Sequence, residues 1–141
     1  ELKKNKFIKW EIKDVLEIDD CSKKFDGICM SYGLRNLNNV EEGIKKVFFL
    51  LKDKGRAGFL DFNHSVKNSL SNIFQKIYLR LVVVTISRLF DLSPEYKYIE
   101  KSISNFPKKN ELLKISMEVG FKKAEYKTLL GGQMGILLLA K

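Results

Sequence analysis

One stretch near the start of this 141-residue chain limits its possible folds more than any other. The apolar run Gly27–Met30 ends in Ser31-Tyr32-Gly33-Leu34-Arg35-Asn36, a group of small and polar residues. The pattern of Val40–Leu51 then predicts a helix, and Gly58–Phe62 predicts another strand. Strand, polar loop, helix and strand in this order are typical of an open α/β sheet, which binds ligands at the carboxyl ends of its strands.

The rest of the chain predicts further strands and helices around this unit. Phe7–Ile12 alternates apolar and polar residues, which favours a strand. Two more helices are predicted over Pro94–Ser104 and Lys109–Val119. Lys122–Leu129 and Met134–Ala140 predict an antiparallel hairpin at the edge of the sheet. The predicted fold class is therefore α/β, with a mostly parallel sheet closed by an antiparallel hairpin.

The charge of the chain disfavours a nucleic-acid partner. Its 26 basic and 17 acidic residues give a formal net charge of +9. Most of the basic residues are Lys, scattered with no run longer than a pair. Nucleic-acid readers rely on Arg for bidentate contacts to bases and phosphates. Attraction to an anionic lipid surface fits a Lys-rich surface better.

A long apolar segment, Leu70–Leu92, raises the question of a membrane. Lys76, Arg80 and Arg88 interrupt it, so no run approaches the ~20 apolar residues that a spanning helix needs. We expect a buried or interfacial helix with peripheral membrane contact, although Val82–Ile86 is also compatible with a strand.

The two cysteines, Cys21 and Cys29, lack the spacing of a metal site, and we expect no metal. Cys29 lies in an apolar run, which predicts a small core residue. The charged N-terminal residues do not form a signal-peptide pattern. A reduced, cytoplasmic setting is the expected location.

Several polar residues at predicted strand ends have both a functional and a local interpretation. Asp14 could accept a hydrogen bond from a ligand amine, or cap the amides of its own turn. Ser31 and Gly33 would let a ligand approach the backbone closely, or form an ordinary bend. Arg35 and Asn36 could meet an anionic or carbonyl-bearing substrate, or form a surface salt bridge.

The motif FDGICMSYGLRNL, followed by a helix and LKDKGRAGFLDF, resembles the C-methyltransferase family of menaquinone and ubiquinone biosynthesis. That family carries GLRN after its fourth strand, then LKPGG and a strand ending in an acidic residue and Phe. Leu92–Ile103 resembles its Y-x-Y-L-x-x-S-I segment, and Met117–Phe121 resembles its A-G-F element. The ending Gly131–Gly135 is more similar to the phylloquinone branch.

The resemblance implies a Rossmann-like class I methyltransferase fold that uses S-adenosyl-L-methionine to methylate a ring carbon of a lipid-soluble, prenylated quinone or quinol. By position, Asp14 and Val15 would contact the adenine of the cofactor, and Ser31 would contact the cofactor at the end of the fourth strand. Arg35 and Asn36 would face the ring and help to deprotonate or polarise the quinol oxygen.

The residues implied for the substrate pocket are Tyr32, Gly33, Tyr96 and Tyr98. One departure from the family is at the front: its first strand, its glycine-rich cofactor loop and its ribose-binding acidic residue have no counterpart before Phe7. We therefore interpret residues 1–141 as the C-terminal portion of such a domain. The alternative is a non-catalytic remnant or interaction module that pairs an open strand edge with a partner, including a second copy.

Overall fold

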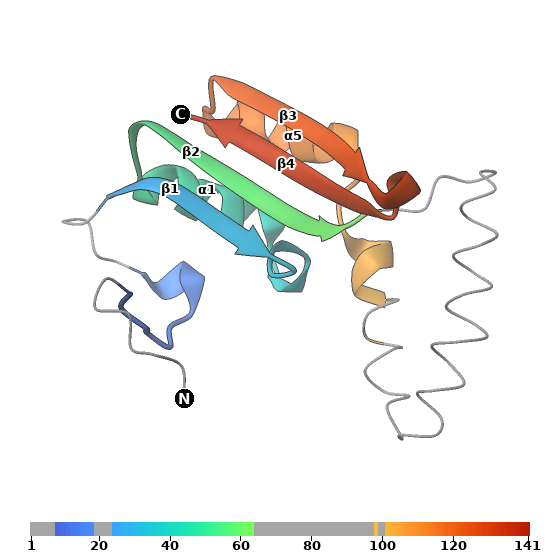
Figure 1. Ribbon diagram of the computed structural model, residues 1–141, viewed down its shortest axis with the longest axis horizontal. Helices are drawn as coiled ribbons and strands as arrows, with labels where there is room; N and C mark the ends of the chain where they lie inside the picture. The colour runs from blue at the N-terminus through green and yellow to red at the C-terminus, as the bar shows by residue number, and fades with distance from the viewer. Residues whose placement is uncertain (1–7, 19–23, 64–97, 99–100) are drawn as a thin grey trace.

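The computed structural model describes residues 8–18, 24–63, 98 and 101–141, which form a mixed α/β unit (Figure 1). Its elements, in chain order, are η1 (Val15–Glu17), β1 (Phe25–Ser31), η2 (Leu34–Asn36), α1 (Val40–Leu50), β2 (Leu51–Phe62), α5 (Lys109–Val119), β3 (Lys123–Leu129), η4 (Leu130–Gly132) and β4 (Met134–Ala140). Residues 101–105 are also helical, as predicted for this part of Pro94–Ser104.

The sheet has four described strands in the order β1-β2-β4-β3. β1 runs parallel to β2, with Cys29 opposite Gly58. β4 lies antiparallel on the other side of β2, and β3 pairs antiparallel with β4 at the sheet edge. The predicted parallel pair and the predicted hairpin are both confirmed, but the described part of the sheet is mixed rather than mostly parallel, because β4 and β3 add antiparallel pairs to it. Among the described residues, β1 has a strand on one side only.

Both long helices cover the same face of this sheet. Figure 1 shows α1 behind β1 and β2, and α5 behind β4 and β3. The helices also contact each other, and alternate residues of β2 and β4 are buried beneath them. Burial of this apolar surface is the main stabilising contribution to the fold. The core residues are Leu34, Ile44, Val47, Leu51, Ala57, Phe59, Phe106, Leu112, Phe121, Leu137 and Leu139.

The ends of the helices follow local rules. Asn39 caps α1, because its side chain accepts a hydrogen bond from the Glu42 amide at 3.2 Å. Lys141 stabilises the other end of α1: its Nζ donates to the carbonyls of Phe48 at 2.7 Å and Leu51 at 2.9 Å. Gly120 ends α5 in the left-handed conformation, with φ of 113°.

The opposite face of the sheet has no helix over it in the described part of the chain. Leu60, Ile136 and Leu138 are half-buried there, and Cys29 is exposed. The prediction that Cys29 is a core residue is therefore wrong. A strand in an apolar run is buried on both sides only when both sheet faces are covered, and Cys29 points away from the helices while Ile28 and Met30 pack against the core.

The predicted strand at Phe7–Ile12 is also wrong for its described residues, 8–12, which have no regular structure. Trp10 and Ile12 are exposed. Alternation of apolar and polar residues is not sufficient for a strand, because the backbone amides and carbonyls also need a neighbouring strand. These residues pair with no strand of the described sheet.

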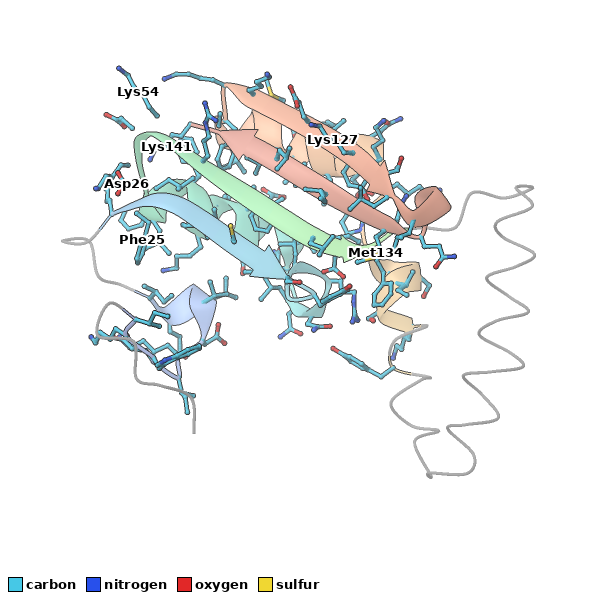
Figure 2. The ribbon with its side chains drawn as sticks, in the orientation of Figure 1. Phe25, Asp26, Lys54, Lys127, Met134 and Lys141 are labelled. Atoms are coloured by element: carbon cyan, nitrogen blue, oxygen red, sulfur yellow. The ribbon has the colours of Figure 1, made fainter. Side chains whose placement is uncertain are left out.

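β2 begins earlier than predicted because it includes a looped-out segment. Leu51 pairs with Phe25 and Arg56 pairs with Gly27, so residues 52–55 bulge out between them. Within the bulge, Lys54 has a positive φ of 64°. Figure 2 shows Lys54 at the opposite end of the sheet from Met134.

The predicted helix at Leu70–Leu92, with its Lys76, Arg80 and Arg88, lies outside the described residues. In the part of the chain that the structure describes, we find no helix with the length and apolar character required to traverse a bilayer.

Candidate functional site

The candidate site lies where the parallel strands end. β1 ends at Ser31 and is followed by η2, while the parallel strand β2 ends at Phe62, beside it in the sheet. This carboxyl edge of an open α/β sheet is the usual place for a ligand. Arg35 and Asn36, predicted from the sequence to meet a substrate, lie in η2 at this edge.

Arg35 is held by a buried ion pair with Asp61. Its Nε lies 2.9 Å from Oδ1 of Asp61, and the two side chains are 7% and 4% exposed. Among the described residues Arg35 Nε makes no directed hydrogen bond, so this is an ionic contact. The backbone amide of Arg35 also donates to Asp61 Oδ2 at 3.1 Å. The guanidinium lies over the ring of Phe62, 5.3 Å from its centroid.

Further contacts join Arg35 to the segment around Tyr98. The Nη1 group of Arg35 donates to Ser102 Oγ and, at 3.1 Å, to Asn36 Oδ1. Asn36 Oδ1 also accepts from the hydroxyl of Tyr98 at 3.1 Å, and Asn36 Nδ2 donates to the carbonyl of Tyr32 at 2.9 Å. The structure therefore brings together three of the predicted site residues, Arg35, Asn36 and Tyr98.

These residues line one side of a cleft of about 520 Å³. This volume is in the range of small-molecule sites, which are typically ~300–1,000 Å³. The cleft lies between the η2–α1 junction and the segment that includes Tyr98, Ser102 and Phe106, and it extends to the start of α5 at Glu111. It combines amide, hydroxyl and guanidinium groups with apolar surface, which suits a flat ring carrying polar oxygens.

The other predicted substrate residues lie elsewhere. Gly33 and Tyr32 do not line the cleft. Tyr32 packs its ring against Phe62, at 5.2 Å between centroids, and directs its hydroxyl to Met134 Sδ at 3.8 Å. Tyr96 lies outside the described residues. The substrate roles of these three residues stay predictions.

The predicted cofactor residues are only partly available for a ligand. Asp14 caps η1, because its Oδ1 accepts from the Leu16 amide at 2.8 Å, which is the local alternative considered from the sequence. Val15 is half-buried in η1. Ser31 is exposed at the carboxyl end of β1, a position that fits contact with a bound nucleoside. These residues fit part of a cofactor site and offer few groups to hold the whole molecule.

Sequence reasoning missed two residues of the site. From the sequence, Asp61 is only the acidic residue that ends a strand, and Ser102 is only part of a motif. Their partner Arg35 is distant along the chain, so no periodicity links them to it. Only the resemblance to the methyltransferase family could have identified them, because Asp61 and Ser102 both lie within the sequence motifs that the chain shares with that family.

A second polar group, formed by Tyr126, Asn63 and Gly132, lies close enough to Asp61 for its charge to act on Tyr126. The Tyr126 hydroxyl donates to Asn63 Oδ1 at 3.2 Å, and Asn63 Nδ2 donates to the carbonyl of Gly132 at 3.1 Å. Burial raises the pKa of the Tyr126 phenol, and the negative charge of Asp61 raises it further. Within the described ranges, no three His, Cys, Asp or Glu residues are grouped as a metal site would require.

The model of the ubiE/COQ5 methyltransferase family matches residues 3–141. The chain belongs to this family. A similar family member is a 2-phytyl-1,4-naphtoquinone methyltransferase of Synechocystis, which is 34% identical over 134 residues, covering 95% of this chain and 56% of the relative. The enzyme of the same name from Thermosynechococcus vestitus is 36% identical, with coverages of 95% and 59%.

A plant member of the ubiE/COQ5 methyltransferase family is also similar. The chloroplastic 2-phytyl-1,4-beta-naphthoquinone methyltransferase of Arabidopsis thaliana is 35% identical over 135 residues, covering 94% of this chain and 51% of the relative. The chain thus spans about half the length of the curated relatives it matches.

Solved structures agree on the fold. An O-methyltransferase family protein from Burkholderia thailandensis superposes with a TM-score of 0.58 at 11% identity, covering 92% of this chain and 34% of the other. A SAM-dependent methyltransferase from Thermotoga maritima gives a TM-score of 0.51 at 13% identity, with coverages of 84% and 57%. The Rossmann-like class I methyltransferase fold predicted from the sequence is thereby confirmed.

Proposed function

We propose that this chain is the substrate-binding part of an enzyme that transfers a methyl group from S-adenosyl-L-methionine to a ring carbon of a prenylated naphthoquinol, a step of phylloquinone biosynthesis. The names of its relatives support the naphthoquinone ring and the phytyl tail. Menaquinone and ubiquinone precursors are the alternative substrates. The observation that carries the proposal is the group formed by Arg35, Asn36 and Tyr98 at the edge of the cleft.

The chemistry requires stabilisation of a ring oxygen. When bound, S-adenosyl-L-methionine supplies a methyl group on a positively charged sulfur. A quinol ring carbon becomes nucleophilic when the adjacent ring hydroxyl loses its proton, and a cation next to the resulting oxyanion stabilises the charge. Arg35 suits this role because an arginine guanidinium stays protonated in proteins and carries several N–H donors. Because it stays protonated, Arg35 is suited to polarising the quinol oxygen and not to removing its proton.

Methyl transfer to matched quinols tests the proposal. The full gene product is supplied with reduced 2-phytyl-1,4-naphthoquinone, or with a benzoquinol that carries the same tail. Mass spectrometry of the lipid extract should show one added methyl group on the naphthoquinol only, and the Arg35→Met variant should lose most of this product. Equal methylation of both rings would contradict the ring assignment. Absence of product from either ring would contradict the activity.

A non-catalytic interaction module is the second candidate, and it is favoured by the edge of β1, along which no other strand lies in the described part of the chain. Unpaired strand backbone can pair with another chain, including a second copy. Light scattering combined with a quinone-binding measurement separates the two candidates, since the enzyme proposal requires quinone binding in any oligomeric state. A concentration-dependent dimer that binds no quinone would favour the module.

We also propose a cytoplasmic location with peripheral membrane contact through Leu70–Leu92. Both parts of this proposal rest on the sequence alone.

A further inference from the structure

Asp61 is one of two buried polar residues among those described, and both of its carboxylate oxygens are engaged. Oδ1 accepts from the Phe62 amide at 2.8 Å and contacts Arg35 Nε at 2.9 Å. Oδ2 accepts from the Arg35 amide at 3.1 Å. One carboxylate therefore holds Arg35 at two points, at its backbone and near the tip of its side chain.

This double contact determines where the remaining donors of Arg35 lie. With Nε held by Asp61, Nη1 reaches Ser102 and Asn36, and the guanidinium plane lies over Phe62. Within the described ranges Nη2 donates to no other residue, and Arg35 is among the residues that line the cleft. Nη2 is thus the group of Arg35 left to donate to a ligand.

We propose that Asp61 is a positioning residue, which aligns the Arg35 guanidinium so that it donates to a negatively charged oxygen on a ring bound in the cleft. This inference rests on the proposed function, since it takes the ring oxyanion as the ligand. An arginine side chain has several rotatable bonds, and a fixed contact near its tip removes most of the unproductive conformations.

Electrostatics alone predicts the opposite effect, and this makes the inference testable. Asp61 is negative and lies next to Arg35, so neutralising it strengthens the attraction of the site for an anion if Arg35 stays in place. If Asp61 positions Arg35, the same neutralisation weakens anion binding, because the guanidinium loses its alignment. The two accounts therefore differ in the sign of the change.

The experiment compares two naphthoquinones of the same ring size that differ at one ring substituent, which is ionised in one and uncharged in the other. The anionic probe is 2-hydroxy-3-methyl-1,4-naphthoquinone, which is ionised near neutral pH. The neutral probe is 2,3-dimethyl-1,4-naphthoquinone. Because both carbons of its quinone double bond carry methyl groups, it does not react covalently with the exposed thiol of Cys29. Binding of each probe to the 141-residue chain is measured by calorimetry, and the ratio of the two affinities is the readout.

We expect the wild-type chain to bind the anionic probe more tightly than the neutral one. In Asp61→Asn the ratio of the two affinities should fall about tenfold, which is the effect of losing one charge-assisted hydrogen bond. Affinity for the neutral probe should stay within about twofold. The matched control is Asp26→Asn, which removes the same charge from an exposed carboxylate paired with Lys52 at the far end of β1 (Figure 2). This control should keep the preference. An unchanged or increased preference in Asp61→Asn would overturn the inference.

Two further measurements apply if Asp61→Asn does not fold. Asp61→Glu keeps the charge but displaces the carboxylate, and it should also lose preference for the anion; full retention would contradict positioning. In the wild-type chain, the Arg35 Nε–H should exchange slowly with solvent by nuclear magnetic resonance, because the ion pair with Asp61 holds it in a buried position. Exchange as fast as in a free arginine would overturn the inference. Failure of the wild-type chain to bind either probe, with slow exchange at Arg35, would count against the proposed function alone.

Discussion

Lys54 has a backbone conformation that glycine adopts more readily. Its φ is 64°, in the left-handed region where a side chain costs about 1 kcal/mol. The related motif has glycine here, in the fourth position of L-K-P-G-G. We expect Lys54→Gly to raise the free energy of unfolding by about 0.5–1 kcal/mol, measured by urea denaturation.

The control for Lys54→Gly is the same substitution in a helix. Lys114 is exposed in α5, and Lys114→Gly should lower stability by about 1 kcal/mol, because glycine is a poor helix former. Equal destabilisation by both substitutions would contradict the assignment of strain to Lys54.

Gly135 is required by the ring of Tyr126. A Cβ at Gly135 would approach the Tyr126 hydroxyl to 1.8 Å, so that the ring would have to move and break its bond to Asn63. Gly135→Ala should therefore cost about 2 kcal/mol or more of stability, as overpacking does. Differential scanning calorimetry should show a lower Tm, and the cost should shrink in a background of Tyr126→Ala.

A second glycine in the same sheet provides the control. At Gly58 the nearest atom to an added Cβ is a Leu138 methyl at 3.7 Å, an ordinary contact. Gly58→Ala should leave the Tm nearly unchanged. A loss as large as that of Gly135→Ala would mean that the strand, rather than Tyr126, rejects the methyl group.

Tyr126 should make the fold sensitive to alkali. Its pKa is raised above the usual 10.0, first by burial and then by Asp61, so the folded chain holds the phenolic proton more tightly than the unfolded chain. This contribution to stability is complete below the unfolded pKa and is lost as pH rises towards the folded pKa. Urea denaturation between pH about 9 and 11 should show a steeper loss for wild type than for Tyr126→Phe. Parallel curves would contradict the assignment.

At the scale of elements, two adjacent asparagines, Asn38 and Asn39, precede α1, and asparagine is a residue type that caps helices. The structure places the cap at Asn39, whose side chain accepts from Glu42. We expect Asn39→Ala to lower the free energy of unfolding by about 1 kcal/mol, and the exposed neighbour Asn38→Ala to change it by less than about 0.5 kcal/mol. Reversed values in urea denaturation would move the cap to Asn38.

Helices and strands could be predicted where the spacing of their apolar residues matches the face that they bury or the strand next to them in the chain. The helix at Val40–Leu50 could be identified because its apolar residues Ile44 and Val47 recur at helical spacing and are buried, and the hairpin strands pair as their sequences predicted. The strand predicted at Phe7–Ile12 is wrong because a strand also needs a neighbouring strand, and the sequence of the segment itself does not show whether one is present. The exposure of Cys29 has the same cause.

At the scale of the whole molecule, the site was only half predictable. Arg35 and Asn36 were identified because they follow a buried strand within a motif, and Tyr98 because of a second motif. Asp61 could not be assigned to Arg35, since they come together only when β2 lies beside β1. Local sequence predicted the two strands, but the contact between these side chains depends on the register of the sheet.

The cofactor residues lead to a prediction for the whole chain. Asp14 already caps η1, and the sequence has no glycine-rich loop for a nucleotide. We expect the 141-residue chain alone to bind S-adenosyl-L-methionine weakly, with a Kd above about 100 μM by calorimetry. Stoichiometric binding with a sub-micromolar Kd would show that other residues complete the site.

The strand order has a consequence for the chain as it is synthesised. β1, α1 and β2 leave the ribosome well before β4, the second neighbour of β2, which begins only at Met134. Until then, the edge of β2 that pairs with β4 lacks that strand, and the part of the core that β4 completes stays open. The nascent chain therefore has to be protected from aggregation while the intervening residues are translated, and chaperone contact should be most important in that interval.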